Sequence, residues 1–305
     1  MRVVTMLPSA TEIVYALGVE PVAVSHECDH PPGARERPSV DRTRVDPDAD
    51  SAAIHEQVAA AERGEGVYAI DRETLRAADP DLVVTQGVCD VCAVDRVVVE
   101  DAVDALDLDC EVLTTDPHLL ADVFADIERI GAALGRAEAA ADLVADLRAR
   151  VERVETAVEG RPRPRTAVLD WLDPLMVSGH WVPDLVERAG GAFGLAAPGE
   201  RSTTREWADL RAYDPEVLVA APCGFDPDRT RREADALTDR PGYADLAAVR
   251  DGRAYAVDGN HLVNRPGPRL VDTLEHLAGL IHPGAVDAPP TGPVRPFPAP
   301  AAERP

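Results

Sequence analysis

Two short stretches of the chain repeat one pattern, and they limit its fold more than any other feature. Residues 79–92 are DPDLVVTQGVCDVC, and residues 214–224 are DPEVLVAAPCG. Each begins with an acidic-Pro-acidic triplet, continues in an apolar run rich in Val and Leu, and ends in a Gly-containing turn that carries cysteine. A short apolar run bounded by turn residues is typical of a buried strand. One such strand in each half of the chain predicts two similar lobes.

Strand and helix patterns alternate in both halves, which predicts an α/β fold with mostly parallel sheets covered by helices. In residues 117–158 apolar residues recur at three- and four-residue spacing for longer than in an ordinary helix, so we expect a long connecting helix with a bend near Gly131 or Gly135. The predicted parts are an N-terminal α/β lobe over 1–116, the connecting helix over 117–160, a C-terminal α/β lobe over 161–283, and a disordered Pro- and Ala-rich tail over 284–305.

The charge balance excludes several classes of function. The chain has 31 basic residues, all of them arginine, against 55 acidic residues, and its net charge is -24. The absence of lysine excludes a Walker A loop and Schiff-base chemistry. The acidity argues against nucleic acid as a partner and indicates a solvated acidic surface, such as salt-adapted proteins carry. Neither GxSxG nor HExxH occurs, so we predict no catalytic residues and a protein that is not an enzyme.

The beginning of the chain bears on its location. It starts MRVVTMLPSATEIV, without the apolar core and cleavage site of a signal peptide. No stretch approaches the roughly 18 continuous apolar residues of a transmembrane segment. We therefore expect a cytoplasmic protein, in which the five cysteines are thiols or metal ligands rather than a disulfide framework.

The candidate site lies in the loops that follow the predicted strands, because open α/β sheets bind ligands outside the carboxyl ends of their strands. His180 follows Gly179, which lets the backbone approach a ligand closely. Asn264 and Arg265 are expected at a helix start, where they would bind a carboxylate, a phosphate or amide groups. The predicted ligand-binding residues are His26, Glu27, Cys28, Gln86, Cys89, Cys92, Trp171, His180, Trp181, Cys223, Phe225, Asn264 and Arg265.

Thiols and an imidazole among these residues form a candidate metal site. Cys89 and Cys92 make a CxxC motif, which indicates half of a zinc site, a redox pair, or a thiol pair at a helix start. No second CxxC occurs, so further ligands would come from Cys28, Cys223 and His26. Such a set suits zinc, copper(I), iron or an axial bond to cobalt. The alternative is that a free cysteine serves as a small buried hydrophobic residue, and both interpretations remain open.

The same segments carry a resemblance to a known family. In chain order they are LPSATEIVYALG, SHECDHPP, DPDLVVTQGVCDVCAV, the long helix, DWLDP with GHW, DPEVLVAAPCGF and NRPGPRL. Over residues 2–282 the chain resembles the cobalamin-binding branch of the helical-backbone (class III) substrate-binding proteins, which serve importers of cobalamin, iron-siderophores and haem. The resemblance implies two Rossmann-like α/β lobes joined by one backbone helix, with cobalamin or another corrinoid or metal chelate held between them.

The resemblance also implies partners. In the family, one glutamate on each lobe docks onto arginines of the importer membrane subunits, and Glu73 and Glu206 occupy the matching places. The alternative is that each is a solvated glutamate near a helix start, where negative charge suits the helix dipole.

We therefore predict a non-catalytic binding protein for cobalamin or a related corrinoid or metal chelate. The alternative function is a thiol-based protein that binds or handles zinc or iron, with chelatase or redox activity on the same fold. A third is a transporter subunit that reaches the outside of the cell by another route.

Overall fold

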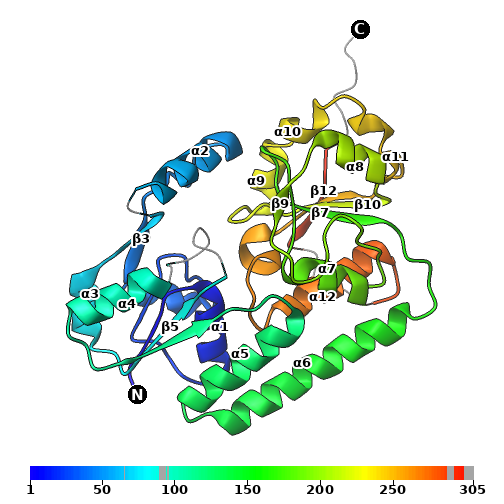
Figure 1. Ribbon diagram of the computed structural model, residues 1–305. Coiled ribbons are helices and arrows are strands. Elements are labelled where there is room, and N and C mark those ends of the chain that lie inside the picture. The colour runs from blue at the N-terminus through cyan, green and yellow to red at the C-terminus, as the bar shows by residue number, and fades with distance from the viewer. Residues whose placement is uncertain (65, 89–93, 95, 287–291, 299–305) are drawn as a thin grey trace. The chain divides into compact units, whose positions relative to one another are not determined.

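The computed structural model describes residues 1–64, 66–88, 94, 96–286 and 292–298 (Figure 1). The chain divides into two compact units. The first comprises Met1–Ala49, Ala53–Pro117 and Ala121–Leu147, and the second comprises Asp50–Ala52, His118–Leu120 and Arg148–Pro305. Each unit contains a sheet with helices, so the prediction of two α/β lobes is confirmed. None of the helices in the described ranges has both the length and the apolar composition needed to cross a bilayer.

The first unit is built on a four-stranded parallel sheet in the order β2-β1-β5-β6. Its strands are β1 (Val3–Thr5), β2 (Ala23–Val24), β5 (Leu82–Gln86) and β6 (Glu111–Thr115). A separate antiparallel pair, which the sequence pattern did not reveal, consists of β3 (Asp41–Thr43) and β4 (Tyr68–Ile70). The helices up to the end of β6 are α1 (Pro8–Ala16), the 3-10 turn η1 (Pro32–Glu36), α2 (Ser51–Glu62), α3 (Arg72–Ala78) and α4 (Arg96–Ala105).

The second unit has a six-stranded sheet in the order β12-β11-β10-β7-β8-β9. The three strands β7, β10 and β11 are parallel, and β8, β9 and β12 add antiparallel pairs. The strands are β7 (Thr166–Trp171), β8 (Met176–Val177), β9 (Thr203–Thr204), β10 (Val217–Ala220), β11 (Ala254–Val257) and β12 (Val294–Pro296). The helices and turns are α7 (Trp181–Arg188), α8 (Trp207–Tyr213), α9 (Pro227–Arg232), α10 (Asp235–Thr238), η2 (Tyr243–Asp245), α11 (Ala247–Arg250), η3 (Gly259–Val263) and α12 (Leu270–Ile281).

The predicted single helix over 117–160 is two helices, α5 (Leu120–Ala133) and α6 (Ala137–Val158). Gly135 lies between them with φ 67°, a left-handed conformation that ends a helix and that glycine adopts without strain. The expected bend is therefore a full interruption. α6, at 22 residues, begins in the first unit and ends in the second.

The acidic-Pro-acidic triplet has the same structural role in each unit. In the first unit Asp79 ends α3 in the left-handed conformation, with φ 42°. Asp81 Oδ2 accepts a hydrogen bond from the backbone N–H of Arg2 at 2.6 Å, and Arg2 Nε donates to the carbonyl of Ala78 at 2.8 Å. The triplet thus joins the end of a helix to the start of the first strand.

The second unit repeats these contacts. Asp214 ends α8 with φ 44°, and Glu216 Oε2 accepts from the backbone N–H of Arg165 at 3.0 Å. Arg165 Nε donates to the carbonyl of Asp214 at 3.0 Å. The repeat seen in the sequence therefore belongs to the scaffold and carries no information about the ligand.

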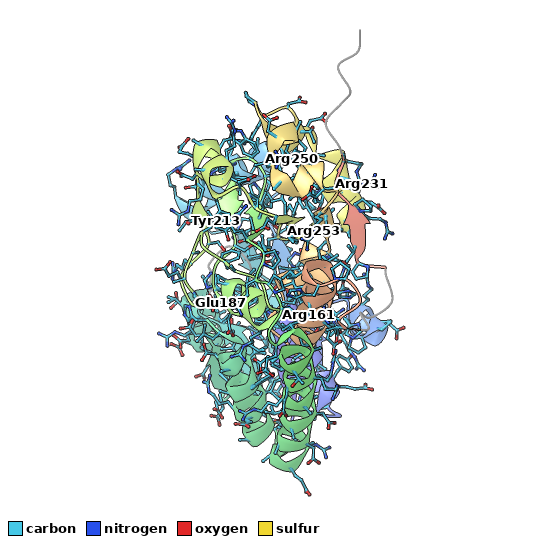
Figure 2. All side chains as sticks on the ribbon, turned by 90° about the vertical axis from the view of Figure 1, so that its right-hand side faces the viewer. Arg161, Glu187, Tyr213, Arg231, Arg250 and Arg253 are labelled. Carbon is cyan, nitrogen blue, oxygen red and sulfur yellow. The ribbon has the colours of Figure 1, made fainter. Side chains whose placement is uncertain are left out.

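Arginine side chains also donate hydrogen bonds to the last carbonyls of other helices. Two of these arginines, Arg161 and Arg253, are labelled in Figure 2. Arg161 Nε donates to the carbonyl of Ala157 at 2.9 Å at the end of α6, and Arg253 Nη2 donates to that of Ile281 at 2.9 Å at the end of α12. A cation at a helix C-terminus satisfies free carbonyls and suits the helix dipole. In a chain without lysine, arginine alone fills this role.

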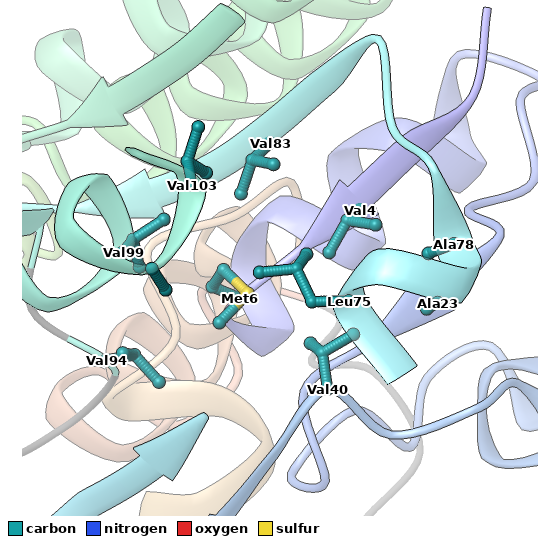
Figure 3. Close-up of a cluster of buried hydrophobic side chains, with 11 residues drawn as sticks. Val4, Met6, Ala23, Val40, Leu75, Ala78, Val83, Val94, Val99 and Val103 are labelled. Atoms are coloured by element: carbon teal, nitrogen blue, oxygen red, sulfur yellow. The ribbon is translucent and has the colours of Figure 1, made fainter. Parts of the chain in front are cut away.

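A cluster of buried apolar side chains fills one face of the first sheet (Figure 3). Val4 and Val83 from the central strands meet Leu75 of α3 and Val99 and Val103 of α4. The strand residues between them are buried as well, since every residue of β5 is covered. Burial on both faces is typical of a parallel sheet and leaves the ends of its strands for function.

The prediction of a disordered tail over 284–305 is wrong for residues 292–298. Residues 287–291 and 299–305 lie outside the described residues. Within the tail, Val294–Pro296 forms β12, which pairs antiparallel with β11. Phe297 is buried, at 7% exposure. The Pro-rich composition suggested disorder because proline removes a hydrogen-bond donor, but an edge strand tolerates proline where its N–H would point away from the sheet.

Candidate ligand-binding site

In the first unit His26 follows β2 and is fixed by Asp41 at the start of β3. The Asp41 side chain is fully buried. Its Oδ1 accepts hydrogen bonds from Ser25 Oγ at 3.0 Å, from the backbone N–H of His26 at 2.9 Å and from His26 Nδ1 at 2.6 Å. Because an ionised carboxylate only accepts, Nδ1 carries a proton. The other ring nitrogen, Nε2, lies 3.2 Å from Oε1 of the exposed Glu27.

These neighbours decide the charge of His26. Burial favours the neutral imidazole, but the hydrogen bonds to Asp41 and Glu27 and their negative charges outweigh it and raise the pKa of His26 to about 9. The ring is therefore protonated at neutral pH. A protonated imidazole has no lone pair for a metal, so His26 is equipped to donate hydrogen bonds in this state rather than to coordinate.

Cys28 lies in the interior of the first unit, at 3% exposure. Its Sγ is 2.9 Å from Thr11 Oγ1, which is in turn 2.6 Å from Thr5 Oγ1. Val24 and Ala34 pack around it. This setting matches the alternative interpretation of a free cysteine as a small buried residue.

The loop after β5 is described only in part. Gln86, the last residue of the strand, is buried, and the backbone N–H of Gly87 donates to the carbonyl of Thr115 at 2.8 Å. Cys89 and Cys92, the predicted CxxC pair, lie outside the described residues.

In the second unit two predicted aromatic residues meet at the carboxyl ends of β7 and β10. The rings of Trp171 and Phe225 have centroids 5.1 Å apart. The guanidinium carbon of Arg229 lies 3.7 Å from the centroid of the Phe225 ring, on which it stacks. Arg229 Nε is 3.6 Å from Glu233 Oε1. Arg229 was not predicted, since nothing in the pattern of α9 shows which of its residues faces the preceding loop.

Cys223 is half-buried in the same loop as Phe225. Its backbone N–H donates to the carbonyl of Asp170 at 3.2 Å, which ties the loop to the end of β7. Burial raises the pKa of the Asp170 carboxyl, and a hydrogen bond with Ser202 opposes this shift only in part. Asp170 Oδ1 has no hydrogen-bond partner within the described part of the chain. Asp170 was not predicted, although an aspartate ending an apolar strand is a usable signal.

The loop after β11 is tied to the loop after β10. Asp258 Oδ1 accepts from the backbone N–H of His261 at 2.7 Å, and its Oδ2 lies 2.9 Å from His261 Nδ1. The backbone N–H of Gly259 donates to the carbonyl of Phe225 at 3.0 Å. A Cβ at Gly259 would lie 2.1 Å from the carbonyl oxygen of Pro222, so only glycine permits this approach.

Asn264 and Arg265 lie in the same loop and not at a helix start as predicted, because α12 begins at Leu270. Asn264 Nδ2 donates to the carbonyl of Ala221 at 3.0 Å. Arg265 is 5% exposed, and its Nη2 donates to Asn260 Oδ1 at 3.3 Å. Both side chains therefore hold the loops together, and no helix N-terminus stands behind them.

His180 precedes α7 with a backbone conformation, φ 50° and ψ -122°, that residues other than glycine rarely adopt. Two hydrogen bonds hold it there, from its N–H to the carbonyl of Glu200 at 2.5 Å and from the N–H of Gly199 to its own carbonyl at 2.9 Å. A Cβ at Gly179 would lie 2.3 Å from the Glu200 oxygen. Glycine at 179 thus permits the close packing of two loops.

Trp181 is 7% exposed, and its Nε1 donates to the carbonyl of Val263 at 2.8 Å. The indole therefore anchors α7 to the loop after β11. The ring of His118 lies 5.6 Å from that of His180. His118 was not predicted, because its segment was assigned to the connecting helix.

Metal ligands are not gathered in the described residues. No group of three or more His, Cys, Asp or Glu side chains that could hold a metal ion occurs among them. Of the predicted set, Cys28 and His26 belong to the first unit and Cys223 to the second, and the CxxC pair lies outside the described residues. The predicted cysteine cluster therefore finds no support here.

The two predicted docking residues lie at corresponding places. Glu73 is exposed in the first turn of α3, and Glu206 is the exposed residue that precedes α8. Each of these helices ends at the left-handed aspartate of the repeated triplet.

Comparisons with known proteins agree with this architecture. A family model described as "Periplasmic binding protein" matches residues 3–260. The uncharacterized ABC transporter substrate-binding lipoprotein YvrC of Bacillus subtilis (strain 168) is 23% identical over 296 residues, which cover 92% of this chain and 80% of that protein.

Solved structures show the same fold. A periplasmic heme binding protein from Pseudomonas aeruginosa has TM-score 0.72 and 22% identity and covers 99% of each chain. The periplasmic vitamin B12 binding protein BtuF of Vibrio cholerae has TM-score 0.64 and 20% identity, with 92% of this chain and 96% of that chain covered. An ABC-type Fe3+-hydroxamate transport system structure from Saccharomonospora viridis DSM 43017 has TM-score 0.67 and 25% identity, with 92% and 93% covered.

The matched family model spans most of the chain, both units have the expected sheets, and the relatives are binding proteins rather than enzymes. The chain belongs to the periplasmic binding protein family, as a substrate-binding protein related to those of ABC importers.

Proposed function

We propose that the protein binds cobalamin or a closely related corrinoid. The observation that carries this proposal is the surface at the carboxyl ends of β7, β10 and β11, where the Trp171–Phe225–Arg229 stack lies beside the loop that carries Asn260 and Asn264. Aromatic rings and a stacked guanidinium suit the flat, largely apolar face of a macrocycle.

The charges of this surface favour a ligand with neutral substituents. Arg229 lies beside Glu233, and Arg265 donates to Asn260. Arg229 and Arg265 are thus both engaged with the protein itself. Corrinoids carry amides around the ring, whereas haem carries two carboxylates that would need a cation each. Heme, vitamin B12 and Fe3+-hydroxamate all appear in the descriptions of the structural relatives, so the charge of the surface is the argument for the corrinoid.

Titration of the purified protein decides between these ligands. We expect aquocobalamin to stay bound through a desalting column and to change its visible spectrum. Trp171→Ala should weaken binding roughly 10- to 30-fold, as for an aromatic residue at the centre of an interface. Trp207→Ala is the matched control, since Trp207 also lies under an arginine, Arg240, but outside the Trp171–Phe225 stack. Retention of haemin or of a ferric hydroxamate in place of aquocobalamin would refute the corrinoid.

The partner follows from the family. We propose that importer membrane subunits bind the protein through Glu73 and Glu206, which are exposed on separate units. Charge reversal at both positions should abolish stimulation of the reconstituted importer's ATPase activity, while the same reversal at the exposed Glu159 should leave it unchanged. Equal effects at all three positions would argue against specific docking.

Cytoplasmic location stays a prediction from the sequence. Relatives are described as periplasmic or as a lipoprotein. Cell fractionation followed by detection of the protein tests the location directly.

A further inference from the structure

The C-terminal segment adds an edge strand to the sheet of the second unit. β12 pairs with β11 so that Ala256 lies opposite Arg295. The N–H of Asp258 donates to the carbonyl of Pro293 at 2.9 Å, and the N–H of Phe297 donates to that of Ala254 at 2.8 Å. We propose that residues 292–298, here called the strap, position the ligand-binding loop 258–265. The role of this loop in ligand binding rests on the proposed function, whereas its positioning by the strap does not.

The sequence of the strap suits pairing on one side only. In an antiparallel pair, hydrogen-bonded positions alternate with positions whose N–H points outward. Residues 293 and 297 are both hydrogen-bonded to β11, and Arg295 lies midway between them. The N–H of Arg295 therefore faces β11, while the backbone nitrogen of residue 296 faces away from it. Proline at 296 therefore removes a donor from the outer edge, whereas Pro293 faces β11 and takes part there through its carbonyl alone. Proline on an outer edge discourages further strands from adding, so the strap closes the sheet.

Contacts outside the strand hold the strap in place. The ring of Phe297 lies 6.4 Å from that of Tyr243, and Tyr243 Oη donates to the carbonyl of Pro298 at 3.0 Å. Arg295 Nε lies 3.6 Å from Asp228 Oδ1 in α9. The strap therefore contacts β11, η2 and α9.

The attachment points lead directly to the ligand-binding loops. Asp258, which the strap holds through its N–H, is the residue whose carboxylate binds His261. The next residue, Gly259, is bonded to Phe225. Asp228, which the strap contacts through Arg295, precedes Arg229 of the aromatic stack. The main-chain bond to Asp258 therefore carries the positioning, while the exposed Arg295–Asp228 pair contributes little.

Two substitutions at one position separate the strand from the side chain. Arg295→Pro removes the N–H that faces β11, whereas Arg295→Gln keeps it and removes only the guanidinium. We expect hydrogen exchange at residues 258–265 to accelerate roughly tenfold in the proline variant, since one ladder bond is lost, and to stay near the wild-type rate in the glutamine variant. Binding of aquocobalamin should weaken roughly five- to tenfold in the proline variant alone.

The outcomes are distinct. Unchanged exchange at 258–265 in Arg295→Pro would overturn the proposal, and so would equal acceleration across β7 and β10, which would indicate a general loss of stability. If exchange accelerates locally but no version of the protein binds aquocobalamin, the strap is supported and the proposed ligand is refuted.

Discussion

At the scale of single residues, a buried carboxyl makes stability depend on pH. Asp126 in α5 is 5% exposed. Burial raises its pKa from 3.8 to about 6, against the hydrogen bond from Arg129 and with a further contribution from Asp122 and Asp116. A folded-state pKa above the unfolded value means that the folded protein holds this proton more tightly. Stability from this group is therefore full below about pH 4 and is lost as the pH rises through 6.

Replacement of this carboxyl tests the argument. Asp126→Asn keeps an acceptor for Arg129 and cannot ionise, so we expect the free energy of unfolding at pH 7.5 to rise by roughly 1–2 kcal/mol. The gain should vanish near pH 4. Urea denaturation at both pH values measures it, with the exposed Glu128→Gln as a control that removes the same charge. A gain of equal size at pH 4, or in the control, would contradict the role of burial.

His26 extends the same trend to higher pH. Its pKa rises from 6.5 to about 9 in the folded state, where burial is outweighed by hydrogen bonds to Asp41 and Glu27. The stability that it contributes is present below pH 6.5 and is lost as the pH rises through about 9. We expect the unfolding free energy to fall over this range in the wild type and to be flatter in His26→Gln. NMR titration of the His26 ring checks the cause, because Asp41→Asn should lower its pKa. A His26 pKa that Asp41→Asn leaves unchanged would refute the pairing.

Residues of the candidate site were easier to predict from the sequence than the side chains that contact them. Trp171 and Phe225 were predicted because each follows a strand, and the structure brings their rings together. Arg229 and Asp41, which fix Phe225 and His26, were missed. Their contacts arise from the way loops return to the sheet, and a single sequence does not encode that path in any short pattern. The described residues hold no cluster of the predicted metal ligands, and Cys89 and Cys92 lie outside those residues.

At the scale of elements, the turn between α5 and α6 depends on two glycines with different roles. A Cβ at Gly131 would lie 2.4 Å from the Cβ of Ala140, whereas a Cβ at Gly135 would meet no atom within 4 Å. Gly131→Ala forces the two helices apart, and we expect a loss of roughly 1–3 kcal/mol in unfolding free energy. Gly135→Ala meets only the backbone strain of φ 67°, which costs about 1 kcal/mol.

Chemical denaturation of both variants measures the difference. Adding Ala140→Gly to Gly131→Ala should recover part of the loss, because the two positions share one contact. No recovery in the double variant would show that the close approach of α5 and α6 is not the cause.

Elements that follow a regular period were predictable, and those that depend on pairing were not. The buried strands β5 and β10 lie where the apolar runs predicted them. The strands β3 and β12 contain polar residues or proline, β4 has only three residues, and all three are strands only because a partner lies beside them. The apolar spacing also continues across Gly135, where the helix is interrupted. Such spacing shows which face of a helix is apolar and does not show where the helix ends.

At the scale of the whole molecule, the net charge of -24 predicts a dependence on salt. With 55 acidic residues against 31 arginines, repulsion between like charges exceeds attraction, and compaction brings those charges closer. Salt shortens the range of this repulsion from about 10 Å at 0.1 M to about 3 Å at 1 M. We therefore expect the melting temperature to rise by several degrees when NaCl is increased from 0.1 to 1 M. A rise of this size corresponds to a gain of ~1 kcal/mol in the free energy of unfolding.

The control is the same measurement near pH 4.6, the isoelectric point, where net repulsion is absent. There the increase with NaCl should largely disappear. An equal increase at both pH values would mean that salt acts through apolar burial rather than through charge, since that effect does not depend on ionisation. A decrease at neutral pH would mean that ion pairs such as Arg150 with Asp272 and Glu275 outweigh the repulsion of the acidic surface.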